Sequence, residues 1–184
     1  MGIMFKKGTT NSKRIMLGQT EIAKIMYRNN TVWLKDQEID TLLYTIVNDQ
    51  YANYNNVDGK LRLDLYRNGY NSSYSYIKFN DVVDFSRYNT ITIKRNLYYS
   101  SPDASITDIK LRIMIYDNNN VVIRQSASMN ITDLPRNTSR DYMQVLNVAD
   151  ITGQYHVGVF DYYLPPFSNY PLSLEVKYDS IVVS

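Results

Sequence analysis

Apolar and polar residues alternate with a period of two along much of the chain beyond residue 40. In residues 61–66, for example, three leucines alternate with Arg62, Asp64 and Tyr66. Successive side chains of a β-strand point to opposite faces, so this pattern predicts strands that bury one face and expose the other. The same alternation predicts further strands in residues 90–94, 109–116, 155–159 and 172–179.

Turn residues separate these predicted strands. Asn68-Gly69 favours a hairpin turn because both residues accept a positive φ, and Asp117–Asn120 is a second polar turn. Between the strands we find no amphipathic helix of the kind that parallel crossovers require. Residues 41–184 are therefore expected to form an antiparallel β-sandwich, with residues 180–184 as a paired strand. Periodicity alone does not choose between a jelly roll and an immunoglobulin-like sandwich.

An internal repeat precedes this body. Arg14–Ile22 aligns with Lys24–Val32, each copy having a basic residue, Ile-Met, a turn and a β-branched end. Each copy is too short to bury its own apolar side, so we expect two small β-hairpins that need a neighbour. Residues 1–13 are expected to be a loose polar arm unless another segment holds them, and residues 35–40 a connector. The predicted organisation is thus an N-terminal arm and repeat in residues 1–36, followed by the sandwich.

Composition and net charge argue against several classes of function. The chain has 184 residues, 18 Tyr, no Cys, and a formal net charge of +2. The small charge argues against nucleic-acid binding, and no apolar run is long enough to span a bilayer. The N-terminal residues lack the apolar core of a signal peptide, so synthesis in a cytoplasm is expected.

Catalytic constellations are not recognisable in the sequence. Most Asp residues lie in turn contexts, which leaves no clear carboxylate pair for a glycosidase, although we keep that class as an alternative. His156, the single histidine, lies in a predicted strand and is expected to be a satisfied or surface residue rather than a catalytic one. Residues 117–120 are interpreted as a turn rather than a calcium loop, because the following Gly and the distant Glu are missing. We expect no enzyme activity, no cofactor and no metal site.

Tyrosine pairs are the remaining unusual feature. Tyr98-Tyr99 precedes Ser-Ser-Pro, and residues 162–171 combine four aromatic rings with three prolines in an expected loop. Tyrosine rings serve sugar stacking and protein interfaces alike, and they also cap sandwiches without binding anything. The candidate contact residues for a glycan or a protein are Tyr98, Tyr99, Tyr162, Tyr163, Phe167 and Tyr170.

Two segments of the sequence resemble segments of known proteins. Arg14–Trp33 resembles the repeat at the start of many structural proteins of tailed bacteriophages, with Arg28-Asn29 where a second Gly is usual. Residues 147–159 are similar to a late region of jelly-roll, carbohydrate-binding-like domains in phage fibre and baseplate proteins.

The resemblance implies a virion protein of the fibre, baseplate or head-decorating type. Its repeat would dock on other virion proteins, and its jelly-roll-like sandwich would face outward. A homo-oligomer is expected, and the alternative function is an adhesin module that binds a host surface glycan. The implied docking residues are Ile15, Leu17, Gly18, Ile22, Ile25, Tyr27, Val32 and Trp33, although Trp33 also suits a core or hinge position.

Overall fold

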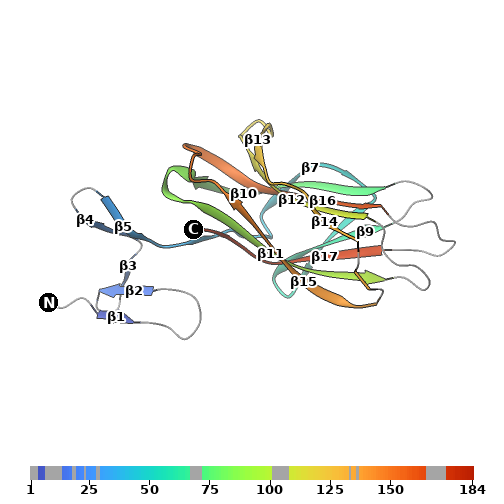
Figure 1. The fold of residues 1–184 in the computed structure, drawn as a ribbon, viewed down its shortest axis with the longest axis horizontal. Helices are drawn as coiled ribbons and strands as arrows, with labels where there is room; N and C mark the ends of the chain where they lie inside the picture. The colour runs from blue at the N-terminus through green and yellow to red at the C-terminus, as the bar shows by residue number, and fades with distance from the viewer. Residues whose placement is uncertain are drawn as a thin grey trace. The chain divides into compact units, whose positions relative to one another are not determined.

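The computed structural model describes residues 4–6, 14–17, 20–22, 24–27, 30–66, 72–100, 108–132, 134–135, 137–164 and 173–184 (Figure 1). Side chains are described from Lys35 onward, apart from Leu164. Contacts divide the chain into one unit from Met1 to Gln37, to which Ser184 is also assigned, and a second unit from Glu38 to Val183. Each unit is described by itself.

The first unit contains short antiparallel strands. The two copies of the repeat each form a hairpin, and a further strand pairs with the first of them. That further strand, β1, lies within residues 1–13 and pairs with β2, so part of the expected arm is held by the first copy of the repeat. The strands are β1 (Met4–Lys6), β2 (Arg14–Leu17), β3 (Thr20–Ile22), β4 (Lys24–Tyr27) and β5 (Asn30–Leu34).

The second unit is a sandwich of two antiparallel sheets. Sheet I has the order β13-β12-β16-β10-β7, with β14 also paired to β12. Its strands are β7 (Tyr44–Gln50), β10 (Ser73–Asp84), β12 (Asp108–Tyr116), β13 (Val122–Gln125), β14 (Met129–Ile131) and β16 (Gln154–Leu164).

Sheet II has the order β15-β11-β17-β9-β8, with β6 also paired to β17. From β9 to β12 and from β14 to β17, successive strands lie in opposite sheets, which is the winding of a jelly roll (Figure 1). Its strands are β6 (Gln37–Glu38), β8 (Ala52–Val57), β9 (Lys60–Tyr66), β11 (Thr90–Ser100), β15 (Ser139–Asn147) and β17 (Ser173–Val183).

The core lies between the sheets and follows the predicted alternation. The leucines of β9 and the isoleucines of β11 and of β12 are fully buried, while Arg62 and Asp64 point outward. The all-β sandwich expected from periodicity is therefore confirmed. Within the described ranges, the structure contains no helix long and apolar enough to cross a membrane.

Two local expectations have different outcomes. The turn at residues 117–120 is present, with Asn120 at φ 64° and the Asp117 carboxylate accepting hydrogen bonds from the amides of Asn119 and Val121. The expected loop at residues 162–171 is wrong at its start, because β16 continues through Leu164. The turn at residues 68–69 lies outside the described residues.

Candidate functional site

Four aromatic rings form one cluster on the outward face of sheet I. The register of β10 and β16 places Tyr74 opposite Tyr162 and Tyr76 opposite Phe160. Ring centroids are 6.0 Å apart for Tyr74 and Tyr76, 4.5 Å for Tyr76 and Phe160, and 6.3 Å for Phe160 and Tyr162. Phe160 is mostly covered by its neighbours, whereas the three tyrosines are half-buried. We call these four residues the aromatic platform.

Gly158 lets Tyr116 lie flat beside the platform. A Cβ on Gly158 would stand 2.4 Å from the Ile77 carbonyl oxygen and 2.4 Å from a ring carbon of Tyr116, so a larger residue does not fit. Tyr116 is 1% exposed, and burial raises its pKa to about 12. Tyr116 and Met114 pack with Phe160 in a small apolar cluster separate from the main core.

Cationic side chains border the platform along β12. Lys110 lies directly opposite Tyr162 in the register and Arg112 directly opposite Phe160. The Lys110 ammonium is 5.2 Å from the centroid of the Tyr162 ring, and the Arg112 guanidinium carbon is 5.6 Å from that of Phe160. These distances allow cation–π attraction, which holds both charges beside the rings.

Amide and hydroxyl side chains border the platform on its other side, along β7. Gln50 lies opposite Tyr74, Asn48 opposite Tyr76 and Thr45 opposite Lys78. Asn48 is exposed and Gln50 half-buried. The face thus combines flat apolar rings with side chains that donate and accept hydrogen bonds.

A buried polar network lies behind the platform. Asp161 follows Phe160 on β16 and points into the core, where its carboxylate accepts a hydrogen bond from the Tyr178 hydroxyl and lies 3.5 Å from Arg95 Nε. Burial raises the pKa of Asp161, and Arg95 opposes that shift. Arg95 also donates to the carbonyl oxygen of Arg112 at 3.2 Å and to Gln144 Oε1 at 3.1 Å. The network therefore connects β11, β15 and β17 of sheet II to the Asp161 side chain on β16 and to the backbone of β12.

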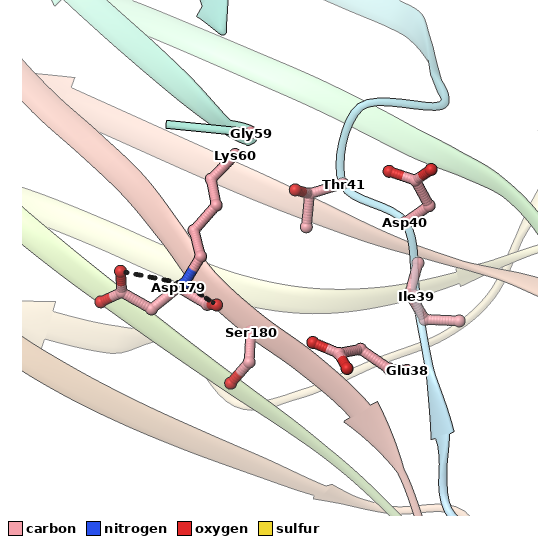
Figure 2. A pocket seen from close by; sticks show the side chains of 8 residues that line it. All are labelled: Glu38, Ile39, Asp40, Thr41, Gly59, Lys60, Asp179 and Ser180. Atoms are coloured by element: carbon pink, nitrogen blue, oxygen red, sulfur yellow. Dashed lines mark hydrogen bonds and ion pairs between the residues drawn. The ribbon is translucent and has the colours of Figure 1, made fainter. Parts of the chain in front are cut away.

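A separate pocket of about 340 Å³ lies on the sandwich beside residues 38–41 (Figure 2). Lys60 donates to the Asp179 carbonyl oxygen at 2.6 Å, and its ammonium is 3.8 Å from that residue's carboxylate. Thr41 Oγ1 accepts a hydrogen bond from the Leu61 amide at 3.3 Å. The Thr41 bond joins residues 38–41 to β9, and the Ile39 amide donates to the Ile181 carbonyl oxygen of β17 at 2.9 Å, so this segment has a structural role. The lining residues are Glu38, Ile39, Asp40, Thr41, Gly59, Lys60, Asp179 and Ser180.

No set of three or more His, Asp or Glu side chains suited to a metal ion occurs in the part of the chain that the structure describes. His156 is 8% exposed, with Nδ1 3.1 Å from the Phe79 carbonyl oxygen and Nε2 3.0 Å from Asn118 Oδ1. Both ring nitrogens therefore have hydrogen-bond partners, which fits the expected satisfied histidine.

The structure separates the candidate contact residues of the sequence analysis. Tyr162 belongs to the platform, whereas Tyr98 lies on the outward face of sheet II, opposite Glu175 and Ser139. Tyr99 and Tyr163 are fully buried in the core with ring centroids 6.0 Å apart, so neither meets a ligand on either outward face.

The remaining candidates receive no structural test. Phe167 and Tyr170 lie outside the described residues, as does Gly18, and the side chains of the other implied docking residues are not described. Sequence reasoning missed Tyr74, Tyr76 and Phe160. The signal for the two tyrosines was the alternation Ser73-Tyr74-Ser75-Tyr76, in which the serines, both fully buried, occupy the inward positions.

No family model matches the chain, and no curated protein matches it either. Among solved structures, similar chains include a xylan-binding module, CBM86, from Roseburia intestinalis (13% identity, TM-score 0.39, 79% of this chain and 95% of that chain). A mannan-recognising module, TmCBM27, gives 10% identity and a TM-score of 0.48 over 80% of this chain and 96% of that chain. Tailspike protein 4 of bacteriophage CBA120, in its enzymatically active domain, gives 11% and 0.43 over 82% of this chain and 19% of that chain. At these identities and TM-scores the similarities assign no function, which has to be argued from the face itself.

Proposed function

We propose that Glu38–Val183 is a non-catalytic carbohydrate-binding module and that its aromatic platform holds a glycan chain. The proposal rests on the aromatic platform itself. On the outward face of sheet I, Tyr74 and Tyr76 of β10 lie directly opposite Tyr162 and Phe160 of β16.

Sugar rings carry an apolar face of C–H groups and a rim of hydroxyls. An aromatic ring covers the apolar face, and nearby polar side chains bond the rim, so binding needs both kinds of group in one place. The platform supplies the rings, while Asn48 and Gln50 on one side and Lys110 and Arg112 on the other supply the polar groups. All of them project from paired strands, so little conformational entropy is lost on binding.

The test is a glycan array followed by affinity electrophoresis of the hits with Tyr76→Ala. Tyr76 is central, because its ring contacts those of both Tyr74 and Phe160. We expect roughly a ten-fold or larger loss of affinity, as for aromatic hot spots in other interfaces. Tyr98→Ala, on the outward face of sheet II, is the matched control and should bind as the wild type does. An array blank at high protein concentration, or equal binding by Tyr76→Ala, would contradict the proposal.

We propose in addition that Met1–Gln37 attaches the protein to other subunits of a tailed-phage particle. What supports this is the pair of hairpins with strands of three to five residues, because sheets of two or three such short strands are marginal alone. The proposed docking residues remain those named from the sequence, and a homo-oligomer remains part of this proposal. Deleting residues 1–36 and measuring incorporation into particles tests it, since normal incorporation would remove the attachment role.

A further inference from the structure

The outward face of sheet I carries more positive than negative charge around the platform. From the row of Asp108 to the row of Gly158, the outward positions of β10, β12 and β16 hold three cations, Lys78, Lys110 and Arg112. Asp108 is the single acidic side chain among these described positions, and it pairs with Lys110 at 2.9 Å. Two cations therefore lie beside the rings without an acidic partner there.

Lys78 is the most unusual of the three. It lies on β10 opposite Gly158 and Thr45, two residues beyond Tyr76 on the same face. It is only 8% exposed, and its ammonium makes no hydrogen bond or ion pair with any residue that the structure describes. The ammonium does not belong to the buried polar atoms that lack a partner, so it keeps contact with water beside the platform and can pair with an anion of a ligand.

Arg112 also has unused hydrogen-bonding capacity. Its Nη1 donates to Gln125 Oε1 at 3.2 Å, but its Nη2 has no hydrogen-bond partner among the residues that the structure describes. The planar guanidinium matches the two oxygens of a carboxylate and stays charged at any physiological pH. Arg112 and Lys78 belong to adjacent rows of the face, Arg112 with Phe160 and Tyr76, and Lys78 with Gly158 and Met114.

We infer that the glycan held by the platform is acidic, a chain of pyranose units that carry carboxylates, as in polyuronates. The sugar rings stack on the platform while a ring carboxylate meets Lys78 or Arg112, which a neutral chain cannot satisfy. The inference rests on the proposed function and adds the substrate class to it.

The experiment compares polygalacturonate and alginate with the same polymers after their carboxyl groups have been reduced to alcohols. Binding of the full chain is measured by isothermal titration calorimetry at low and at high salt. We expect at least one of the acidic polymers to bind roughly ten-fold or more tightly than its reduced form. Raising the salt should weaken that binding, because screening shortens the range of the charge attraction.

Single substitutions test whether Lys78 and Arg112 cause the preference for the acidic polymer. Lys78→Gln and Arg112→Gln should each lose roughly ten-fold in affinity for the acidic polymer and little for the reduced one. Lys177→Gln, on the outward face of sheet II, is the control and should change neither. A thermal unfolding curve for each variant keeps loss of fold apart from loss of binding.

The outcomes separate the two claims. Equal binding of acidic and reduced polymers, with loss in Tyr76→Ala, overturns the acidic class and leaves the platform intact. If the protein binds only neutral glycans, the acidic class is likewise wrong and the proposed glycan binding by the platform stands. If no glycan of either kind binds, both the inference and the proposed function fail.

Discussion

The two outward faces of the sandwich are built from equally regular strands and differ in the charges and rings that they carry. On sheet II, Arg62 lies 2.9 Å from Asp64 and 3.6 Å from Glu175, and Asn96 donates to Asp141 at 2.6 Å. Acidic side chains lie among the cations there, although Lys94 and Lys177 form no ion pair with any residue in the described ranges. On sheet I, rings and cations lie side by side, and the described outward positions of β10, β12 and β16 around the platform hold one acid for three cations. Sheet II thus mixes charges of both signs, whereas the platform face combines rings with an excess of cations and is suited to a ligand.

The largest loss of stability is expected from substituting Arg95, which links the two sheets. Arg95→Met removes the cation beside the fully buried Asp161 and the bonds to the Arg112 carbonyl oxygen and Gln144. Breaking a buried ion pair by removing one partner costs about 3–5 kcal/mol. Urea unfolding at neutral pH measures the loss. A cost below 1 kcal/mol would mean that the network does not hold the platform strands.

The same variant predicts a pH dependence. Burial raises the folded-state pKa of Asp161 above its ordinary value of 3.8, so the folded state binds the proton more tightly than the unfolded state does. Stability from this group is therefore present at low pH and is lost as the pH rises above 3.8 through the folded pKa. Without Arg95 that pKa rises further, so the deficit of Arg95→Met should shrink on acidification. A deficit that grows as the pH falls from 7 toward 4 would contradict this.

Gly158→Ala is expected to have the next largest effect. Its Cβ would clash with the Ile77 carbonyl and with the Tyr116 ring, which has to move off the strand. Overpacking of this kind costs about 1–3 kcal/mol, and displacing Tyr116 should disturb binding as well. Gly59→Ala is the comparison, because it meets nothing within 4 Å and pays only for its positive φ. Thermal unfolding and glycan titration check both, and a fully stable Gly158→Ala with normal binding would be the contrary result.

Tyr162→Ala sharpens the comparison between the faces. Tyr162 is half-buried on the platform, so its loss should weaken glycan binding roughly ten-fold and leave the fold intact. Tyr98→Ala removes the same kind of ring from the outward face of sheet II and should leave affinity unchanged. Affinity electrophoresis of the two variants decides, and the reverse ranking would move the site to the other face.

The smallest effect is expected on the outward face of sheet II. Arg62→Met breaks the contacts with Asp64 and Glu175, which are partly exposed, and such pairs contribute less than about 1 kcal/mol. Glycan affinity should not change. A loss of stability as large as that of Arg95→Met would show that the two networks are equivalent after all.

The sequence predicts the sandwich better than the site for a physical reason. Strands such as β9 and β12 bury aliphatic residues inward, and their periodicity shows this directly. In β10 the pattern is inverted at Ser73–Tyr76, because serines point inward and tyrosines outward. Without the sheet register, the sequence does not show that Tyr74 and Tyr76 meet Phe160 and Tyr162.

The tyrosine pairs illustrate the same limit. Tyr98-Tyr99 and Tyr162-Tyr163 each lie within a strand, where neighbours point to opposite faces, so only one member of each pair reaches a surface. Assigned to a loop, as Tyr162 and Tyr163 were in the sequence analysis, both rings look accessible. Which outward member belongs to the platform depends on its sheet, since Tyr98 lies on sheet II and Tyr162 on sheet I.

The most direct test of the platform is an NMR titration of the isotope-labelled chain with an oligosaccharide found to bind. Glycan binding at the platform predicts amide shift changes concentrated on β10, β12 and β16, centred on Tyr76, Phe160 and Tyr162. The amide signals of residues on the outward face of sheet II, such as Arg62 and Lys177, should not shift. Changes centred on β9, β11 and β17 instead would contradict the account.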